Sequence, residues 1–189
     1  MRWRMALAVC CLSLALVGCA GAATPAPQPT GADAQAGTPM VLTSPAFVEG
    51  ATIPRQYTCD GANVSPPLAW RAAPAAAQSL ALVVDDPDAP SGVWVHWVLF
   101  NLSPSASGLP EGLPQDKVVA GGALQGINSG RATGYSGPCP PSGTHRYYFK
   151  LYALDTTLSL AANAAAKDVQ AAMQGHVMAE AQLMGRYAR

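Results

Sequence analysis

Asp86-Pro87-Asp88-Ala89-Pro90-Ser91-Gly92 sets carboxylates and prolines at the end of an apolar run. Within ten residues follows His96-Trp97-Val98-Leu99-Phe100-Asn101, and much later come Gly137-Pro138-Cys139-Pro140-Pro141 and His145-Arg146-Tyr147. Carboxylate, imidazole and phenol groups at strand ends, beside loops stiffened by proline, are typical of a small rigid polar pocket. The sequence therefore predicts such a pocket, built from these four segments.

Outside these segments the hydrophobic pattern has a period of two over most of the chain. Short runs rich in Val, Leu, Phe, Tyr and Trp, separated by Gly and Pro, predict antiparallel strands at 41–48, 68–70, 79–86, 93–101, 118–119 and 147–154. Only 161–178 has helical spacing, with His176 interpreted as a structural residue on the helix face beside Val169, Met173 and Val177. Alternation after it predicts a final strand. The expected fold is mainly β, an antiparallel β-sandwich with a few short helices.

Strand alternation predicts which polar side chains share a face with apolar ones. The expected faces are Asp86 with Leu80, Leu82 and Val84; His96 with Trp94, Val98 and Phe100; and His145 and Tyr147 with Phe149 and Leu151. Asp85 has the opposite parity and is expected to be solvated or hydrogen-bonded outside the pocket. Polar groups thus adjoin apolar surface where strands begin and end.

The N-terminus has the pattern of an export signal. Arg2 and Arg4 precede an apolar run, 5–17, that is too short to span a bilayer and ends in small residues. Leu16-Val17-Gly18-Cys19 resembles a bacterial lipobox, which predicts a signal peptide over 1–18 and acylation of Cys19, for example with palmitate. The alternative is an ordinary signal peptide cut nearby. The expected location is the exported side of the bacterial cell envelope, with the lipid anchored in a membrane.

The rest of the chain divides into a linker and one domain. Residues 19–39 are mostly Ala, Gly, Pro, Thr and Gln, which predicts a flexible tether, and 40–189 is long enough for one well-packed domain. Without the signal peptide the chain has nine basic and eleven acidic residues, a formal charge of −2. No basic patch suited to nucleic acid is visible, so nucleic acid is not expected as a partner.

The cysteines leave one candidate pair. Cys10 and Cys11 fall in the signal peptide and Cys19 is assigned to lipid. Cys59 and Cys139 remain, either as a disulfide in an oxidising compartment or as two free thiols.

Several short motifs occur in order between about residues 42 and 187. They are Tyr57-Thr58-Cys59-Asp60-Gly61, Asn63-Val64-Ser65-Pro66-Pro67-Leu68, the Asp-Pro-Asp-Ala-Pro box, His96-Trp97, Gly134-Tyr135, the Gly-Pro-Cys-Pro-Pro segment and His145-Arg146-Tyr147. In number and order they resemble the phosphatidylethanolamine-binding protein family, most closely its bacterial YbhB/YbcL branch, often called Raf kinase inhibitor-like. The resemblance implies a β-sandwich with a small pocket for a phosphate-like group.

The resemblance also implies which residues surround the ligand. Matched onto this chain, the expected ligand-binding residues are Asp86, Asp88, His96, Gly137, Pro138, Cys139, His145 and Tyr147. Asp88 is expected to brace the backbone of its own loop. The chain departs from the commonest bacterial pattern at Asn128-Ser129-Gly130-Arg131, so Arg131 is a candidate for an extra positive charge at the rim.

The chemistry of these groups supports the same interpretation. An Asp beside a His fixes its tautomer and favours the protonated ring, while Tyr hydroxyls and loop N–H groups are donors for phosphate or carboxylate oxygens. The hypothesis is that Asp86 orients a histidine, while His96, His145, Tyr147 and the amides of 136–139 contact the anion. Binding is then expected to strengthen as pH falls toward and below about 6.5.

The expected function is a non-enzymatic, membrane-tethered binding protein for a small anionic ligand, such as phosphate or a phospholipid head group, with no cofactor or metal. One alternative is a protein inhibitor or scaffold acting on an envelope enzyme through the same pocket. Another is a hydrolase using Ser91, Ser136 or Ser142, although no Gly-x-Ser-x-Gly motif occurs. A metal-dependent enzyme using Asp86, His96 and His145 is chemically allowed but lacks the usual ligand spacings.

Overall fold

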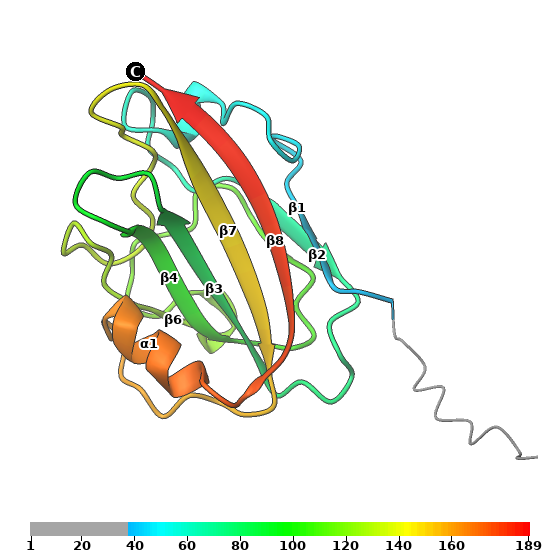
Figure 1. The fold of residues 1–189 in the computed structure, drawn as a ribbon. Coiled ribbons are helices and arrows are strands. Elements are labelled where there is room, and N and C mark those ends of the chain that lie inside the picture. The colour runs from blue at the N-terminus through cyan, green and yellow to red at the C-terminus, as the bar shows by residue number, and fades with distance from the viewer. Residues whose placement is uncertain (1–37) are drawn as a thin grey trace, which may run out of the picture. The chain divides into compact units, whose positions relative to one another are not determined.

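The fold is a β-sandwich of two antiparallel sheets, described over residues 38–189 in a computed structural model (Figure 1). The predicted signal peptide, Cys19 and nearly all of the tether lie outside these residues. The three-stranded sheet has the order β1 (Val41–Thr43), β2 (Leu68–Arg71), β5 (Gly108–Leu109). The five-stranded sheet has the order β6 (Leu124–Gln125), β4 (Trp94–Leu102), β3 (Ser79–Asp86), β7 (Thr144–Leu154), β8 (Val177–Ala188).

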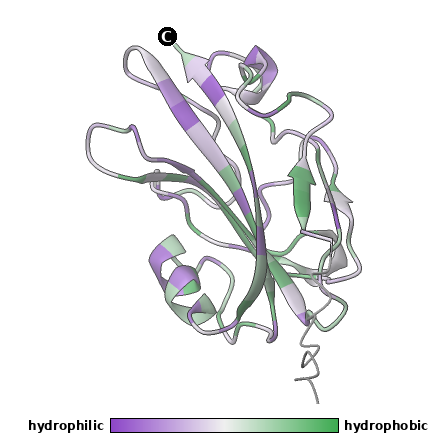
Figure 2. Cartoon of the chain, turned by 45° about the vertical axis from the view of Figure 1, so that its right-hand side comes forward, coloured by the Kyte–Doolittle hydropathy of each residue, from purple (hydrophilic) through white to green (hydrophobic). Residues whose placement is uncertain are grey.

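The main core lies between the two sheets. Strand alternation sends one face of each sheet inward, and the inward side chains form one buried cluster that includes Leu42, Leu68, Trp70, Leu80, Leu82, Val84, Trp97, Leu99, Phe149, Leu151 and Leu183. Figure 2 shows both hydrophilic and hydrophobic residues along the two long strands β7 and β8. The mainly β antiparallel sandwich predicted from the sequence is confirmed.

A second apolar cluster lies on the other face of the five-stranded sheet. It joins Ala81, Val98, Phe100, Leu154 and Leu158 to Val169 and Met173 of the single α-helix described, α1 (Ala166–Met173). Two 3-10 turns, η1 (Arg55–Tyr57) and η2 (Ala120–Gly122), complete the helical content of the described residues. No helix in this part of the chain is long and apolar enough to cross a bilayer.

The predicted helix over 161–178 was too long. The chain leaves the helix after Met173, and Gly175 adopts φ +81°, a left-handed conformation that favours glycine. Val177 already belongs to β8, and His176 lies in the connection with its Nδ1 2.8 Å from Asp155 Oδ1. His176 is therefore an exposed turn residue that is hydrogen-bonded to Asp155 on the surface.

Two predicted strands also differ from the structure. The segment 41–48 is extended only over Val41–Thr43, after which the chain bends. The predicted strand 118–119 is reduced to an isolated bridge between Val118 and Leu124. Both are short segments at the margin of the sandwich, where a strand has a partner along only part of its length.

A bulge in β4 changes the direction of His96. Val84 pairs with Trp97 and Asp85 pairs with Val95, so His96 is an extra residue with no partner on β3. His96 packs against the ring of Tyr147 on the inner face, whereas Val98 and Phe100 pack on the outer face beneath α1. The prediction that His96 shares a face with Val98 and Phe100 was therefore wrong, because alternation does not continue through a bulge.

Candidate functional site

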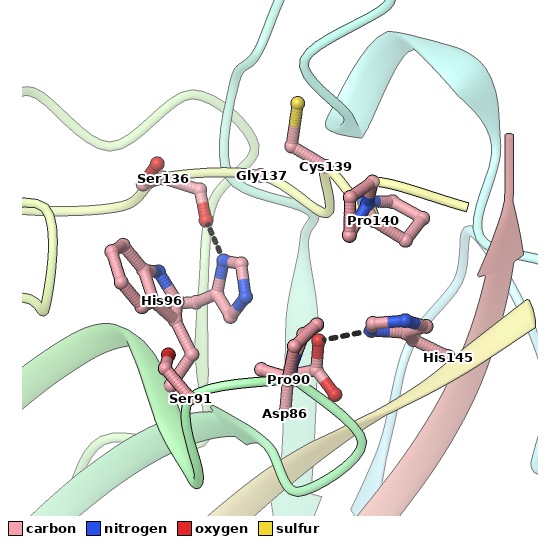
Figure 3. A pocket seen from close by; sticks show the side chains of 12 residues that line it. Asp86, Pro90, Ser91, His96, Ser136, Gly137, Cys139, Pro140 and His145 are labelled. Carbon is pink, nitrogen blue, oxygen red and sulfur yellow. Dashed lines mark hydrogen bonds and ion pairs between the residues drawn. The ribbon is translucent and has the colours of Figure 1, made fainter. Parts of the chain in front are cut away.

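A cavity of about 360 Å³ opens at the end of the sandwich where β3 ends and β4 and β7 begin. Its size is at the lower end of the range for small-molecule sites. Figure 3 shows its side chains converging from the loop after β3, from β4, from the 136–141 loop and from β7. The lining residues are Asp86, Ala89, Pro90, Ser91, Trp94, His96, Ser136, Gly137, Cys139, Pro140, Pro141 and His145.

Asp86 and His145 form a buried pair on one side of the cavity. His145 Nδ1 lies 2.7 Å from Asp86 Oδ2, and the side chains are 9% and 4% exposed. The second carboxylate oxygen, Oδ1, accepts the backbone N–H of Asp88 at 2.8 Å. Since the carboxylate can only accept, His145 Nδ1 is the donor, and Nε2 is the ring nitrogen left for a ligand. The histidine that Asp86 orients is thus His145.

His96 is held differently, by the backbone of the 136–141 loop. Its Nδ1–H donates to the carbonyl of Ser136 at 2.7 Å, and its own carbonyl accepts the N–H of Ser136 at 2.9 Å. Burial lowers the pKa of His96 below its ordinary value, although its hydrogen bond to Ser136 and the charge of Asp86 oppose this shift. Figure 3 shows its second ring nitrogen on the side that faces His145.

Tyr147 lies beneath the cavity and does not line it. Its side chain is fully buried and stacks edge to face with His96, with 5.2 Å between ring centroids. Its hydroxyl has no hydrogen-bond partner among the described residues. Burial, aided by the charge of Asp86, raises the pKa of Tyr147, so the phenol keeps its proton.

The 136–141 loop does not offer the row of amides that was expected. Ser136 N–H donates to His96, Gly137 N–H donates to Asn63 Oδ1 at 2.7 Å, and Pro138 has no N–H. In the predicted segment 136–139, only Cys139 still has a backbone N–H that could face a ligand. The prediction that Ser136 and Gly137 amides face a ligand was wrong, because both bind other parts of the chain.

The loop is instead clamped to the segment around η1. Cys139 and Cys59 form a disulfide, and Cys59 N–H donates to the carbonyl of Pro138 at 3.1 Å. A Cβ on Gly137 would lie 2.4 Å from the carbonyl oxygen of Tyr57, so only glycine allows this approach. Of the two interpretations of Cys59 and Cys139, the structure thus shows the disulfide.

Two other expected site residues lie outside the lining. Pro138 is not among the lining residues, and Asp88 binds Arg146 through both carboxylate oxygens. Arg131 is not among the lining residues either. Trp94, which the sequence placed on the same face as His96 without assigning it a role in the site, lines the cavity beside His96 and forms an apolar wall.

The lining contains no lysine or arginine. Among the lining residues in the described part of the chain, only His96 and His145 can therefore carry positive charge, beside the negative charge of Asp86. Among residues 38–189 no group of three or more His, Cys, Asp or Glu side chains is arranged to hold a metal ion.

Comparisons with known proteins give one consistent result. The family model "Phosphatidylethanolamine-binding protein" matches residues 43–188. A "UPF0098 protein" of Methanothermobacter thermautotrophicus is 54% identical over 150 residues, covering 79% of this chain and 99% of that protein. A "UPF0098 protein" of Chlamydia muridarum is 46% identical over 153 residues, covering 78% and 98%.

Two solved structures are similar over the same region. The putative phosphatidylethanolamine-binding protein homologue CT736 of Chlamydia trachomatis has a TM-score of 0.74 at 44% identity, covering 80% of this chain and 98% of that one. E. coli YbcL, described as a new member of the mammalian PEBP family, has a TM-score of 0.76 at 30% identity, covering 80% and 99%. The described fold and this match lead to one conclusion. The chain belongs to the phosphatidylethanolamine-binding protein family.

Proposed function

We propose that the protein binds a small anionic group, such as phosphate or the phosphoethanolamine head group, in the cavity between His96 and His145. The observation that carries the proposal is the convergence of these two imidazoles, each with Nδ1 already bound, in a cavity that is open to solvent. Each ring is left with Nε2, which donates a hydrogen bond when the ring is protonated. Tetrahedral anions require donors of this kind.

The walls fit a ligand with an organic part. Trp94, Pro90 and Pro140 give an apolar surface beside the histidines. An alkyl ester of phosphate could place its oxygens between the imidazoles and its carbon chain against these residues. Bare phosphate would leave this wall uncovered.

We also propose that the protein is a binder and not an enzyme. Ser91 and Ser136 line the cavity, but within residues 38–189 neither hydroxyl is hydrogen-bonded to His96 or His145. A serine nucleophile needs such a base within reach. Turnover assays with phosphoesters and acyl esters test this point, and any turnover lost in His145→Gln would contradict it.

The N-terminal sequence supports a membrane tether. Acyl chains on Cys19 would hold the domain at a membrane, on the exported side of a bacterial envelope, through the linker up to residue 39. The structural similarity to YbcL supports membership of the YbhB/YbcL branch. The Raf kinase inhibitor-like role that we propose for the pocket rests on the sequence resemblance to that branch. Cys19→Ser is expected to move the protein from the membrane fraction to the soluble fraction. Unchanged fractionation would contradict the tether.

The binding proposal is tested by calorimetry of the full chain with inorganic phosphate and with phosphoethanolamine. Replacing His145 by Gln or His96 by Gln is expected to weaken binding by about tenfold each, the loss of one hydrogen bond to a charged group. His176→Gln is the matched control, because His176 is paired with Asp155 away from the cavity. Equal affinity in all four proteins, or no binding by the wild type, would overturn the proposal.

A further inference from the structure

Three carboxylates at the end of β3 are paired with three basic side chains of β7. The pairs are Asp85 with Lys150 at 2.7 Å, Asp86 with His145 at 2.7 Å, and Asp88 with Arg146 at 2.6 Å. The first pair lies on the outer face of the sheet and the second lines the cavity. Only the third joins β7 to the Pro87–Gly92 loop, which leads from β3 to β4.

The Asp88–Arg146 pair has the geometry of a two-pronged clamp. Arg146 Nε donates to Asp88 Oδ2 at 2.9 Å and Nη2 donates to Oδ1 at 2.6 Å. The backbone N–H of Arg146 donates to Asp88 Oδ2 as well, at 2.9 Å. Bidentate pairs of this kind are the exception among surface ion pairs, most of which contribute little. The guanidinium lowers the pKa of Asp88 to about 2, so the pair stays charged over the whole physiological range.

This clamp completes a closed cycle of bonds that includes the buried Asp86–His145 pair. Asp88 N–H donates to Asp86 Oδ1, Asp86 Oδ2 accepts from His145 Nδ1, and His145 is bonded along the chain to Arg146, which returns to Asp88. The next three residues of the loop, Ala89 to Ser91, form one wall of the cavity. The position of Asp88 is therefore linked both to the wall and to the carboxylate that orients His145.

We propose that Asp88 and Arg146 are positioning residues, whose clamp fixes the Pro87–Gly92 loop on β7 and so sets the shape of the cavity and the place of Asp86. Neither side chain is among those that line the cavity. The effect on ligand affinity rests on the function proposed above, whereas the effect on the loop does not. Asp88, which the sequence placed among ligand-binding residues, acts in this proposal through Asp86.

The test compares the full chain with Arg146→Gln, Arg146→Lys and Arg186→Gln. Arg186 is the matched control, because it is exposed, lies opposite Arg146 on β8, and its side chain has no hydrogen bond or ion pair among the described residues. Hydrogen exchange of the Asp88 amide, followed by NMR, reports the loop without any ligand. Calorimetry with inorganic phosphate and with phosphoethanolamine reports the cavity.

Arg146→Gln removes both guanidinium hydrogen bonds to Asp88 at an exposed site. The Asp88 amide is therefore expected to exchange about tenfold faster, and both ligands to bind about tenfold more weakly. Arg146→Lys keeps the positive charge but lacks the two-pronged geometry of the guanidinium. Its Asp88 exchange rate and its ligand affinities should lie between those of Arg146→Gln and the wild type. Arg186→Gln should match the wild type in both. Unchanged Asp88 exchange in Arg146→Gln would overturn the proposal, whether or not the wild type binds phosphate. Faster exchange with unchanged ligand affinity would overturn the link to the cavity while leaving the binding function intact.

Discussion

The two cavity histidines differ in what holds their Nδ1 atoms. His145 donates to the carboxylate of Asp86, and His96 donates to the uncharged carbonyl of Ser136. Both arrangements leave Nε2 for other partners, but only His145 is hydrogen-bonded directly to a carboxylate. His96 is buried next to Tyr147 and is neutral at neutral pH, because burial lowers its pKa. Its response to acid is therefore a direct probe of the site.

Affinity for an anion should rise as pH falls. His96 has a pKa below its ordinary value of about 6.5, so it gains a proton only in acid, and a bound anion favours the charged ring. Sulfate is a suitable probe, because its charge is constant between pH 7.5 and 5. Calorimetry should show tighter sulfate binding at pH 5, with a smaller rise in His96→Gln and the full rise in His176→Gln. A flat profile in the wild type would contradict this account.

Removing the Asp86 carboxylate should destabilise the domain. Asp86 is 3% exposed and accepts hydrogen bonds from His145 and from the N–H of Asp88. Asp86→Ala leaves the buried ring N–H of His145 and the half-buried N–H of Asp88 without this partner, so the free energy of unfolding should fall by about 3 kcal/mol. Urea unfolding measures the change. Asp155→Ala, which breaks the exposed pair with His176, should cost less than about 1 kcal/mol. Equal losses of unfolding free energy in the two variants would show that the Asp86–His145 pair stabilises the domain no more than an exposed pair does.

The convergence of Asp86, His96 and His145 could be predicted at the residue scale, because all three adjoin apolar runs at strand ends. Which histidine pairs with Asp86 could not, since it depends on the register of β3 against β7. The hydrogen-bond partner of the Gly137 N–H could not be predicted from the sequence either, because that partner, Asn63, is 74 positions away.

At the scale of elements, the irregularities of the strands and loops shape the site. The bulge in β4 turns His96 onto the inner face beside Trp97, where two successive side chains point into the sandwich. Strand existence follows from hydrophobic alternation, so most strands were predicted within a few residues. A bulge leaves the composition of a strand unchanged, so the sequence pattern did not reveal it. The helix boundary failed for a similar reason, because Gly175 and the start of β8 interrupt an apolar spacing that continues to Val177.

Substituting Gly137 tests the packing of the 136–141 loop. A Cβ there would lie 2.4 Å from the Tyr57 carbonyl oxygen and 2.7 Å from Asn63 Oδ1, so the loop must shift. Gly137→Ala should lower the free energy of unfolding by about 2 to 4 kcal/mol and weaken phosphate binding. Gly143→Ala has open space around its Cβ but a φ of +72°, and it should cost only about 1 kcal/mol with phosphate affinity retained. Thermal unfolding and calorimetry measure both effects. Wild-type values for Gly137→Ala would contradict the described loop packing.

At the scale of the whole molecule, two sheets enclose one core and a covalent link ties distant segments at the site. The disulfide joins Cys59 and Cys139, which are 80 residues apart, and holds the 136–141 loop against the segment that follows η1. The sequence supplied the candidate pair, but it left open whether the two thiols meet. Their meeting depends on packing across the sandwich, which no local pattern records.

Breaking the disulfide should lower the free energy of unfolding while leaving the fold unchanged. On the loop-entropy relation, a link that closes about 80 residues stabilises the folded state by about 4 to 5 kcal/mol. The double variant Cys59→Ala with Cys139→Ala should therefore unfold at lower urea concentration, with an unchanged far-ultraviolet circular dichroism spectrum. Reduction of the wild type should give a similar loss. A wild-type midpoint in both cases would show that the cysteines are not bonded.

The most direct measurement of the central claim is a crystal structure of the protein grown with selenate, a tetrahedral anion that anomalous scattering locates without ambiguity. The account predicts an anomalous peak inside the cavity, within hydrogen-bond distance of a ring nitrogen of His96 and of His145. A fully occupied peak elsewhere with an empty cavity, at acidic pH and high selenate concentration, would contradict it.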